Sequence, residues 1–183
     1  MKKTILTLVI MLMATIGFSQ SLPKPGTIGL GVDGITGSPN LLMKVFLSDR
    51  LAGQVIVGAN FDIQGGDAPE GETKVTGTEI RGGLGLYYHL TNTRVSPYIG
   101  IEGLYQASKE GGFYQVEPDM KSSVIAGIAS GAEFFIDKNF SVGVKETIGG
   151  QFDFKRDINN LGVKEEGKTK IYTNTVLTAR YYF

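Results

Sequence analysis

The feature of this sequence that most limits its fold is a strict alternation, along eight segments, of apolar residues with small or polar ones. Near the C-terminal end, Leu177 and Tyr181 lie on one face, and Thr178 and Arg180 lie on the other. Side chains of a β-strand point alternately to its two faces, so this period of two predicts strands rather than helices. The alternating segments are 26–36, 40–47, 51–63, 75–90, 96–108, 120–136, 140–155 and 169–183.

These segments cover about two-thirds of the chain from residue 20 onwards, well above the strand content of an average soluble domain. A closed barrel accommodates such a content, because every strand in it pairs along both edges. Glycine supplies 26 of the 183 residues and recurs too often for stable helices. We therefore expect an all-β fold, an eight-stranded antiparallel up-and-down barrel.

The two faces of the segments differ in a way that predicts a membrane. The apolar face carries almost no charge, as a lipid-facing surface requires, because a Lys or Arg at the bilayer midplane costs about 2–4 kcal/mol. The other face combines glycines with a nearly balanced set of acids and bases, which suits salt bridges in a narrow lumen. We predict a transmembrane barrel whose lumen holds a structural charge cluster. Its expected members are Asp33, Lys44, Asp62, Glu79, Arg81, Glu102, Glu133, Lys145 and Arg180.

The connections between the segments alternate in length. Short ones fall at 48–50, 91–95 and 137–139, and long polar ones at 64–74, 109–119 and 156–168. Outer-membrane barrels have short periplasmic turns and longer extracellular loops, so this alternation places both termini in the periplasm. The first hairpin is an exception, because Ser38-Pro39 leaves it almost no loop. In the long connection 109–119, Phe113 and Tyr114 are the candidates for contact with an extracellular partner.

The N-terminal residues resemble a signal peptide. Lys2 and Lys3 precede an apolar stretch, Ile5 to Phe18, that is shorter than the roughly 20 residues of a membrane-spanning helix. Gly17 and Ser19 are small residues at the positions before a cleavage site. We expect residues 1–19 to be removed as a signal peptide and residues 20–183 to form the barrel domain.

The composition argues against nucleic-acid binding and against most kinds of metal or catalytic site. Lys plus Arg equals Asp plus Glu at 18 each, so the chain lacks the basic excess of a nucleic-acid-binding protein. It has no cysteine and one histidine, which excludes disulfides, thiolate metal sites and multi-histidine metal centres. His89 faces the lumen beside a short turn, and no serine in its own strand would pair with it. We expect no enzymatic activity, no cofactor and no metal.

Two segments carry a resemblance to a known family. The run Leu177–Phe183 and the turn region Tyr87–Gly100 resemble those of the small eight-stranded outer-membrane barrels related to OmpX and the OmpA barrel domain. The resemblance covers essentially all of the chain after residue 19. It implies the outer membrane of a Gram-negative bacterium, with outer-membrane lipid, the barrel-assembly machinery and periplasmic chaperones as partners. It also implies that Tyr181 and Phe183 form the terminal aromatic signal read by that machinery.

The sequence departs from the family's pattern at two points. The first hairpin is short, and Glu146 falls on the predicted lipid face of segment 140–155. A bulge near Gly149-Gly150, or a shifted register, would turn that carboxylate inward. The register of this segment is therefore left open.

The function that we favour is a structural or surface-interaction role through the extracellular loops. A narrow channel or small-solute conduit is the alternative, which requires the lumen charges to open a path for water. A soluble lipocalin-like carrier is a second alternative, which requires the apolar face to point inward.

Overall fold

The structure, a computed structural model, describes residues 23–34, 39–62, 73–109, 112–114, 120–154, 156–158, 163–165 and 167–183. For 73–75, 112–114, 156–158 and 163–165 it describes the backbone alone. The expected signal peptide, residues 1–19, lies outside these ranges.

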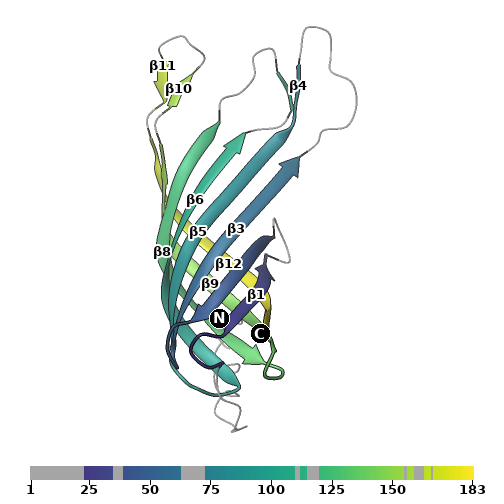
Figure 1. The fold of residues 1–183 in the computed structure, drawn as a ribbon. Coiled ribbons are helices and arrows are strands. Elements are labelled where there is room, and N and C mark those ends of the chain that lie inside the picture. The colour runs from purple at the N-terminus through teal and green to yellow at the C-terminus, as the bar shows by residue number, and fades with distance from the viewer. Residues whose placement is uncertain are drawn as a thin grey trace, which may run out of the picture.

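Eight strands form a closed antiparallel barrel in the order β1-β12-β9-β8-β6-β5-β3-β2, and the pairing of β1 with β12 closes it (Figure 1). The eight-stranded fold class is confirmed, with strand bounds mostly within a few residues of those expected. The strands are β1 (Ile28–Asp33), β2 (Asn40–Phe46), β3 (Leu51–Asp62), β5 (Gly77–His89), β6 (Val95–Lys109), β8 (Lys121–Phe135), β9 (Phe140–Asp153) and β12 (Thr169–Tyr182).

Four further strands of three residues each lie in the long connections, where no strand was expected. β4 (Thr73–Val75) pairs with β7 (Gly112–Tyr114), and β10 (Arg156–Ile158) pairs with β11 (Val163–Glu165). Alternation did not indicate these four strands, because backbone pairing over three residues leaves no periodic pattern in the sequence. Val75 accordingly belongs to β4 and not to the barrel strand.

Side chains close two of the short turns. The Ser48 hydroxyl accepts a hydrogen bond from the Leu51 backbone N–H at 3.1 Å, and one carboxylate oxygen of Asp137 accepts from the N–H groups of Asn139 and Phe140 at 2.7 and 2.8 Å. Serine and aspartate favour such turns because their short side chains reach the backbone two or three residues on. The Tyr182 N–H donates to the Asn139 carbonyl, so the C-terminus lies at this short-turn end.

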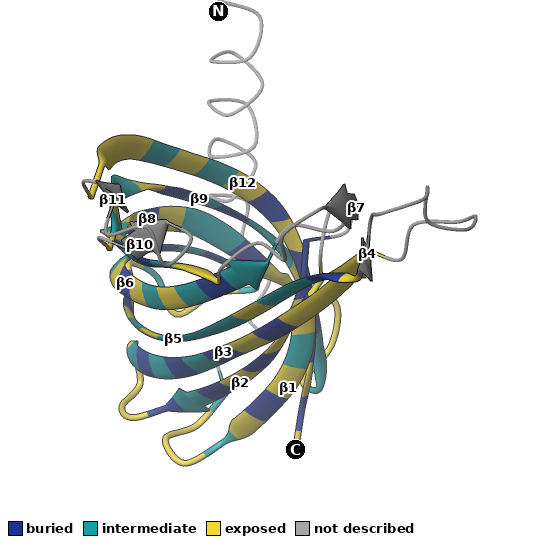
Figure 2. Cartoon of the chain, turned by 90° about the horizontal axis from the view of Figure 1, so that it is seen from above, coloured by how far each residue is buried: buried dark blue, intermediate teal, exposed yellow. Residues whose placement is uncertain are grey.

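Burial alternates along the strands, as the banding of Figure 2 shows, with apolar side chains outward. Leu84, Ile101 and Ile128 are all at least 60 % exposed, whereas Glu133 is 0 % and Lys44 is 1 % exposed. An apolar exterior around a charged interior is the arrangement of a transmembrane barrel and the reverse of a soluble one. The lipocalin-like alternative, which needed the opposite orientation, is therefore wrong.

Exposed aromatic side chains mark two levels of this exterior. Near the short turns they are Tyr88, Phe134, Tyr181 and Phe183, and towards the long connections they are Phe61, Tyr105 and Phe152. Aromatic girdles of this kind sit at the two interfaces of a bilayer. In the part of the chain that the structure describes, no helix has both the length and the apolar character to cross a membrane.

The register of β9 is continuous. Its ladders with β8 and β12 run without a bulge through Gly149 and Gly150. Lys145 and Thr147 are buried in the lumen, so Glu146 between them points outward. The question that the sequence left open is thus settled, and the carboxylate stays on the outer face.

The inward glycines make room for bulky lumen side chains. A Cβ atom built on Gly29 would overlap the ring of Tyr182, and one on Gly131 would lie 2.7 Å from the Tyr98 hydroxyl oxygen. A Cβ on the outward Gly103 would meet nothing within 4 Å. Glycine therefore occurs on the polar face because the lumen has no room for a side chain at these positions. A larger residue there would displace the side chains that fill the lumen.

Candidate functional site

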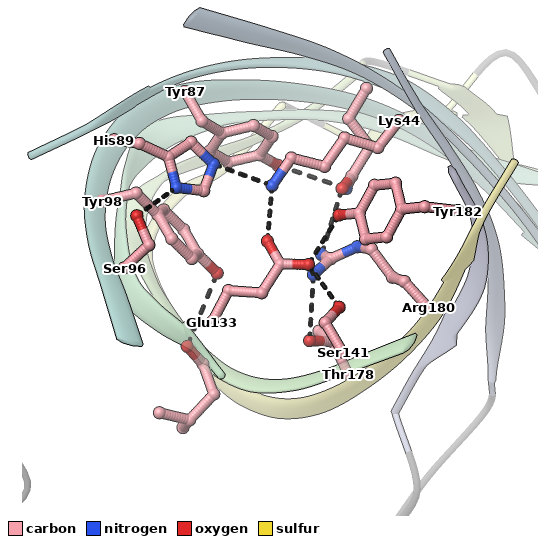
Figure 3. Close-up of polar contacts among 12 residues, drawn as sticks. Lys44, Tyr87, His89, Ser96, Tyr98, Glu133, Ser141, Thr178, Arg180 and Tyr182 are labelled. Carbon is pink, nitrogen blue, oxygen red and sulfur yellow. Dashed lines mark hydrogen bonds and ion pairs between the residues drawn. The ribbon is translucent and has the colours of Figure 1, made fainter. Parts of the chain in front are cut away.

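The lumen contains a hydrogen-bonded charge network centred on Glu133 of β8 (Figure 3). One carboxylate oxygen accepts from the Lys44 ammonium at 2.7 Å. The other accepts from the Tyr182 hydroxyl at 2.6 Å and the Ser141 hydroxyl at 2.5 Å, and lies 3.2 Å from the Arg180 guanidinium. Each of these side chains is at most 3 % exposed. One carboxylate thus balances two cations contributed by β2 and β12.

His89 extends this network on the side of β5. The Lys44 ammonium lies 3.0 Å from Nε2 of His89, and the Ser96 hydroxyl lies 2.8 Å from Nδ1. An ammonium group has no lone pair, so it donates and Nε2 accepts. The Ser96 hydroxyl donates to the Thr91 carbonyl at 2.8 Å and therefore accepts from Nδ1. These partners assign a neutral imidazole protonated on Nδ1.

This Ser96–His89 contact was not expected, because the sequence-based expectation concerned only serines in the same strand as His89. Ser96 comes from the neighbouring strand β6, near the opposite side of the short turn. The pair does not form a nucleophile and its base: Ser96 and His89 are both 0 % exposed, and the hydroxyl proton is committed to a backbone carbonyl. The contact holds the His89 imidazole in place and does not form a substrate-binding site.

A chain of hydrogen bonds leads from this cluster towards the long connections. The guanidinium of Arg180 donates to Gln54 at 3.2 Å, and the Gln54 amide donates to the Tyr87 hydroxyl at 3.3 Å. The Tyr87 hydroxyl in turn donates to Glu102. The Glu102 carboxylate also accepts from Lys145 at 2.6 Å.

Lys145 joins this upper cluster to the first hairpin. Its ammonium lies 3.5 Å from the Asp33 carboxylate, whose other oxygen accepts from the Asn40 amide at 2.7 Å. Thr147 donates to the second oxygen of Glu102 at 2.8 Å. The two clusters together hold Asp33, Lys44, Glu102, Glu133, Lys145 and Arg180.

Of the other three expected members, Arg81 lines a small hollow of the lumen with Asp33, Glu102 and Lys145, and Glu79 and Asp62 lie further towards the long connections. Glu79 and Arg81 are 20 % and 27 % exposed and pair with each other on β5. Asp62 is exposed at the end of β3. They project from the parts of β3 and β5 that extend beyond the short first hairpin, where the lumen is open to solvent.

Below the charges, aromatic side chains close the short-turn end. Phe46, Phe135 and Tyr182 are at most 2 % exposed and form one cluster with Ala52. The Lys44 ammonium also lies 5.2 Å from the centre of the Phe46 ring, within reach of a cation–π interaction. The expected lumen cluster contained charged residues only, although Phe46, Phe135 and the inward tyrosines lie on the same face by alternation, and the structure shows that these aromatic side chains fill the lumen. Their parity with Lys44 and Glu133 along the same strands was the available signal.

At the long-connection end the lumen widens into a polar hollow of about 320 Å³ between the ends of β6, β8, β9 and β12. Lys170 in its wall is 58 % exposed and lies 3.0 Å from the Asp153 carboxylate. The described lining thus combines three lysines and one aspartate with hydroxyl and amide side chains. The lining residues are Gln106, Ser108, Lys121, Ser122, Ser123, Gln151, Asp153, Phe154, Lys168 and Lys170.

The remaining predicted residues lie at the two ends of the barrel. The backbone of Phe113 and Tyr114 belongs to β7, and their side chains fall outside what the structure describes. Tyr181 and Phe183 project outward at the short-turn end, 49 % and 72 % exposed, with ring centres 5.1 Å apart. Across the described residues, no three His, Asp or Glu side chains lie close enough together to bind a metal ion.

Comparison with known proteins finds a likeness in structure and none in sequence. No family model matches the sequence, and no curated protein matches it. Among solved structures, the chain is similar to the attachment invasion locus protein Ail of Yersinia pestis, at 13% sequence identity and a TM-score of 0.46. The match covers 87% of this chain and 99% of that one. The barrel fold itself is established here by the strand ladders.

Proposed function

We propose that this chain is a non-enzymatic protein of the bacterial outer membrane that acts through its long-connection end, which faces the cell exterior. In this proposal residues 1–19 are a cleaved signal peptide, and the termini and short turns are periplasmic. Outer-membrane lipid surrounds the barrel, and the barrel-assembly machinery with periplasmic chaperones inserts it. Alternating short and long connections support this orientation.

The observation that carries the proposal is the closure of the lumen. Glu133 and its partners cross the barrel interior, and the layer of Phe46, Phe135 and Tyr182 lies beneath them. Opening a water path would strip buried charges of their partners, which costs several kcal/mol for each ion. The closed lumen therefore favours a surface-interaction role over a narrow channel.

The polar hollow indicates the chemistry of a surface partner. With three lysines and one aspartate in its lining, it favours an acidic group such as a sulfate, phosphate or carboxylate of a glycan. Phe113 and Tyr114, in the long connection 109–119, remain the proposed aromatic contacts to such a partner.

Orientation is tested on intact cells with single cysteines, which is simple in a chain that has none of its own. A membrane-impermeant maleimide should label Lys121→Cys at the long-connection end and leave Lys138→Cys in a short turn unlabelled. The reverse labelling pattern would overturn the orientation. Heat-modifiable migration of the membrane fraction serves as the folding control for both variants.

Surface binding and conductance separate the two candidate functions. Heparin, as a sulfated polyanion probe, should bind purified full-length protein and lose affinity in the double variant Lys121→Gln/Lys168→Gln, but not in Lys138→Gln. Planar bilayers containing the protein should show no stepwise conductance. Stable unitary currents that change size in Glu133→Gln would favour the channel instead.

A further inference from the structure

One region of the barrel exterior is polar at the depth where lipid chains would lie. Glu146 of β9 projects outward between the aromatic levels marked by Phe140 and Phe152 on the same strand. Among the outward positions of the described barrel strands between these levels, it is the one charged side chain. A charged side chain facing the bilayer interior is costly, rare and commonly functional.

The neighbours of Glu146 on the same face are polar too. Ser130 of β8 and Thr175 of β12 are its direct ladder partners, and Thr173 lies one outward position further along β12. The Ser130, Thr173 and Thr175 side chains are exposed. We call these four residues the outward polar patch. Every other outward position between the aromatic levels of these three strands is occupied by an apolar or small residue.

Contacts within the chain do not use all the hydrogen-bonding positions of the patch. The Thr175 hydroxyl donates to Glu146 Oε2 at 2.6 Å, and it is the one donor to that carboxylate among the described residues. A carboxylate has about four acceptor positions on its two oxygens. Hydrocarbon chains supply no donor, so lipid leaves this group poorly satisfied.

A second irregularity adjoins the patch. β1 has 6 residues and β2 has 7, fewer than the roughly 9–11 of a strand that spans a bilayer. β12 therefore runs on past the end of β1, and from 169 to 176 its edge has no ladder partner among the described residues. Unpaired strand edges do not face lipid in membrane proteins. The poorly satisfied carboxylate of Glu146 and this edge of β12 both indicate that another protein surface lies against the β9–β12 side of the barrel.

We propose that the outward polar patch is the contact surface for a second copy of this chain within the membrane. Every copy is inserted in the same direction, so Glu146 and its neighbouring hydroxyls lie at the same depth in each. A two-fold axis along the membrane normal then sets patch against patch, as in other isologous dimers.

The donors and acceptors of two patches are complementary. The Ser130 and Thr173 hydroxyls of one copy donate to the free acceptor positions of Glu146 in the other. Because the contact is two-fold, each copy both donates and accepts. Hydrogen bonds between membrane-embedded segments have this stabilising effect when small residues allow close approach.

Crosslinking of single-cysteine variants tests the interface in full-length protein folded into phosphatidylcholine vesicles. The chain has no native cysteine, so Ile148→Cys and Val57→Cys each introduce one thiol on the outer face and leave the outward polar patch intact. Ile148 is the outward position next to Glu146 on β9 and is 55 % exposed. Val57 lies on β3, four strands from β9 around the barrel, and is 54 % exposed. With a short bis-maleimide, Ile148→Cys should give dimers and Val57→Cys should remain monomeric.

The role of the carboxylate is tested in the same assay. Adding Glu146→Leu to Ile148→Cys should lower the dimer yield about tenfold, whereas Glu146→Gln, which keeps hydrogen-bonding atoms, should retain most of it. Heat-modifiable migration checks that each variant is folded. Equal yields at 148 and 57, an unchanged yield in Glu146→Leu, or a monomer at every lipid ratio would overturn the proposal.

Discussion

The ammonium of Lys44 donates a hydrogen bond to Nε2 of His89 at 3.0 Å, and both side chains are at most 1 % exposed. The relationship decides the state of the only histidine in the chain, because a protonated Nε2 would point its hydrogen at a cation. It also makes His89 a member of the lumen network, held by charge on one side and by Ser96 on the other.

The protonation of His89 is directly measurable. Nitrogen-15 NMR of the protein in detergent micelles should show a neutral imidazole with its proton on Nδ1, because Nε2 is occupied by the Lys44 donor. In Lys44→Met that constraint is lost, and the other tautomer should gain population. A wild-type spectrum with the proton on Nε2 would contradict the assigned network.

Among the charged lumen residues, Glu133 should be the one whose substitution lowers the unfolding free energy most. Glu133→Gln leaves Lys44 and Arg180 buried without their counter-ion, and breaking a buried ion pair costs about 3–5 kcal/mol of unfolding free energy. The matched variant Glu79→Gln, in a half-exposed pair, should cost about 0–1 kcal/mol. Urea unfolding in phospholipid vesicles measures both; similar losses in the two variants would show that the network is not the main anchor.

Two glycines on opposite faces should respond in opposite ways. Gly131→Ala places a methyl group against Tyr98 in the lumen and should destabilise the barrel by about 1–3 kcal/mol. Gly103→Ala, on the open outer face, should be neutral or stabilise it by up to about 1 kcal/mol, since the unfolded chain loses freedom. The same urea titration compares them, and a loss in Gly103→Ala would refute the assignment of the two faces.

The terminal aromatic residue should matter for assembly more than for stability. Phe183 is 72 % exposed, so Phe183→Ala should change the unfolding free energy of the refolded protein by less than about 1 kcal/mol. If Phe183 is read during biogenesis, the same variant should accumulate poorly in the outer membrane of cells. Phe154→Ala, another exposed phenylalanine at the opposite end, is the control, and equal accumulation of both variants would remove the signal role.

The alternation along the chain is sufficient to predict most of the fold of this protein. The period of two does not depend on which strands pair, so it placed eight strands, the closed barrel and the sidedness of residues such as Leu84 and Glu133. Glycines with the same parity as the charges indicated a crowded lumen. Turn chemistry at Ser48 and Asp137 is likewise local, because those side chains bind backbone groups two or three residues away.

The tertiary structure decided what depends on depth along the barrel and on contacts between distant strands. Parity gave Glu79, Asp62 and Glu133 the same inward direction, yet Glu133 alone of the three lies where the lumen is closed by its neighbours. The meeting of Lys44, His89 and Ser96 joins three strands that sequence spacing does not relate. The sequence also left the direction of Glu146 open, because a bulge changes parity without changing composition, and the continuous ladders of β9 determined that the carboxylate faces outward.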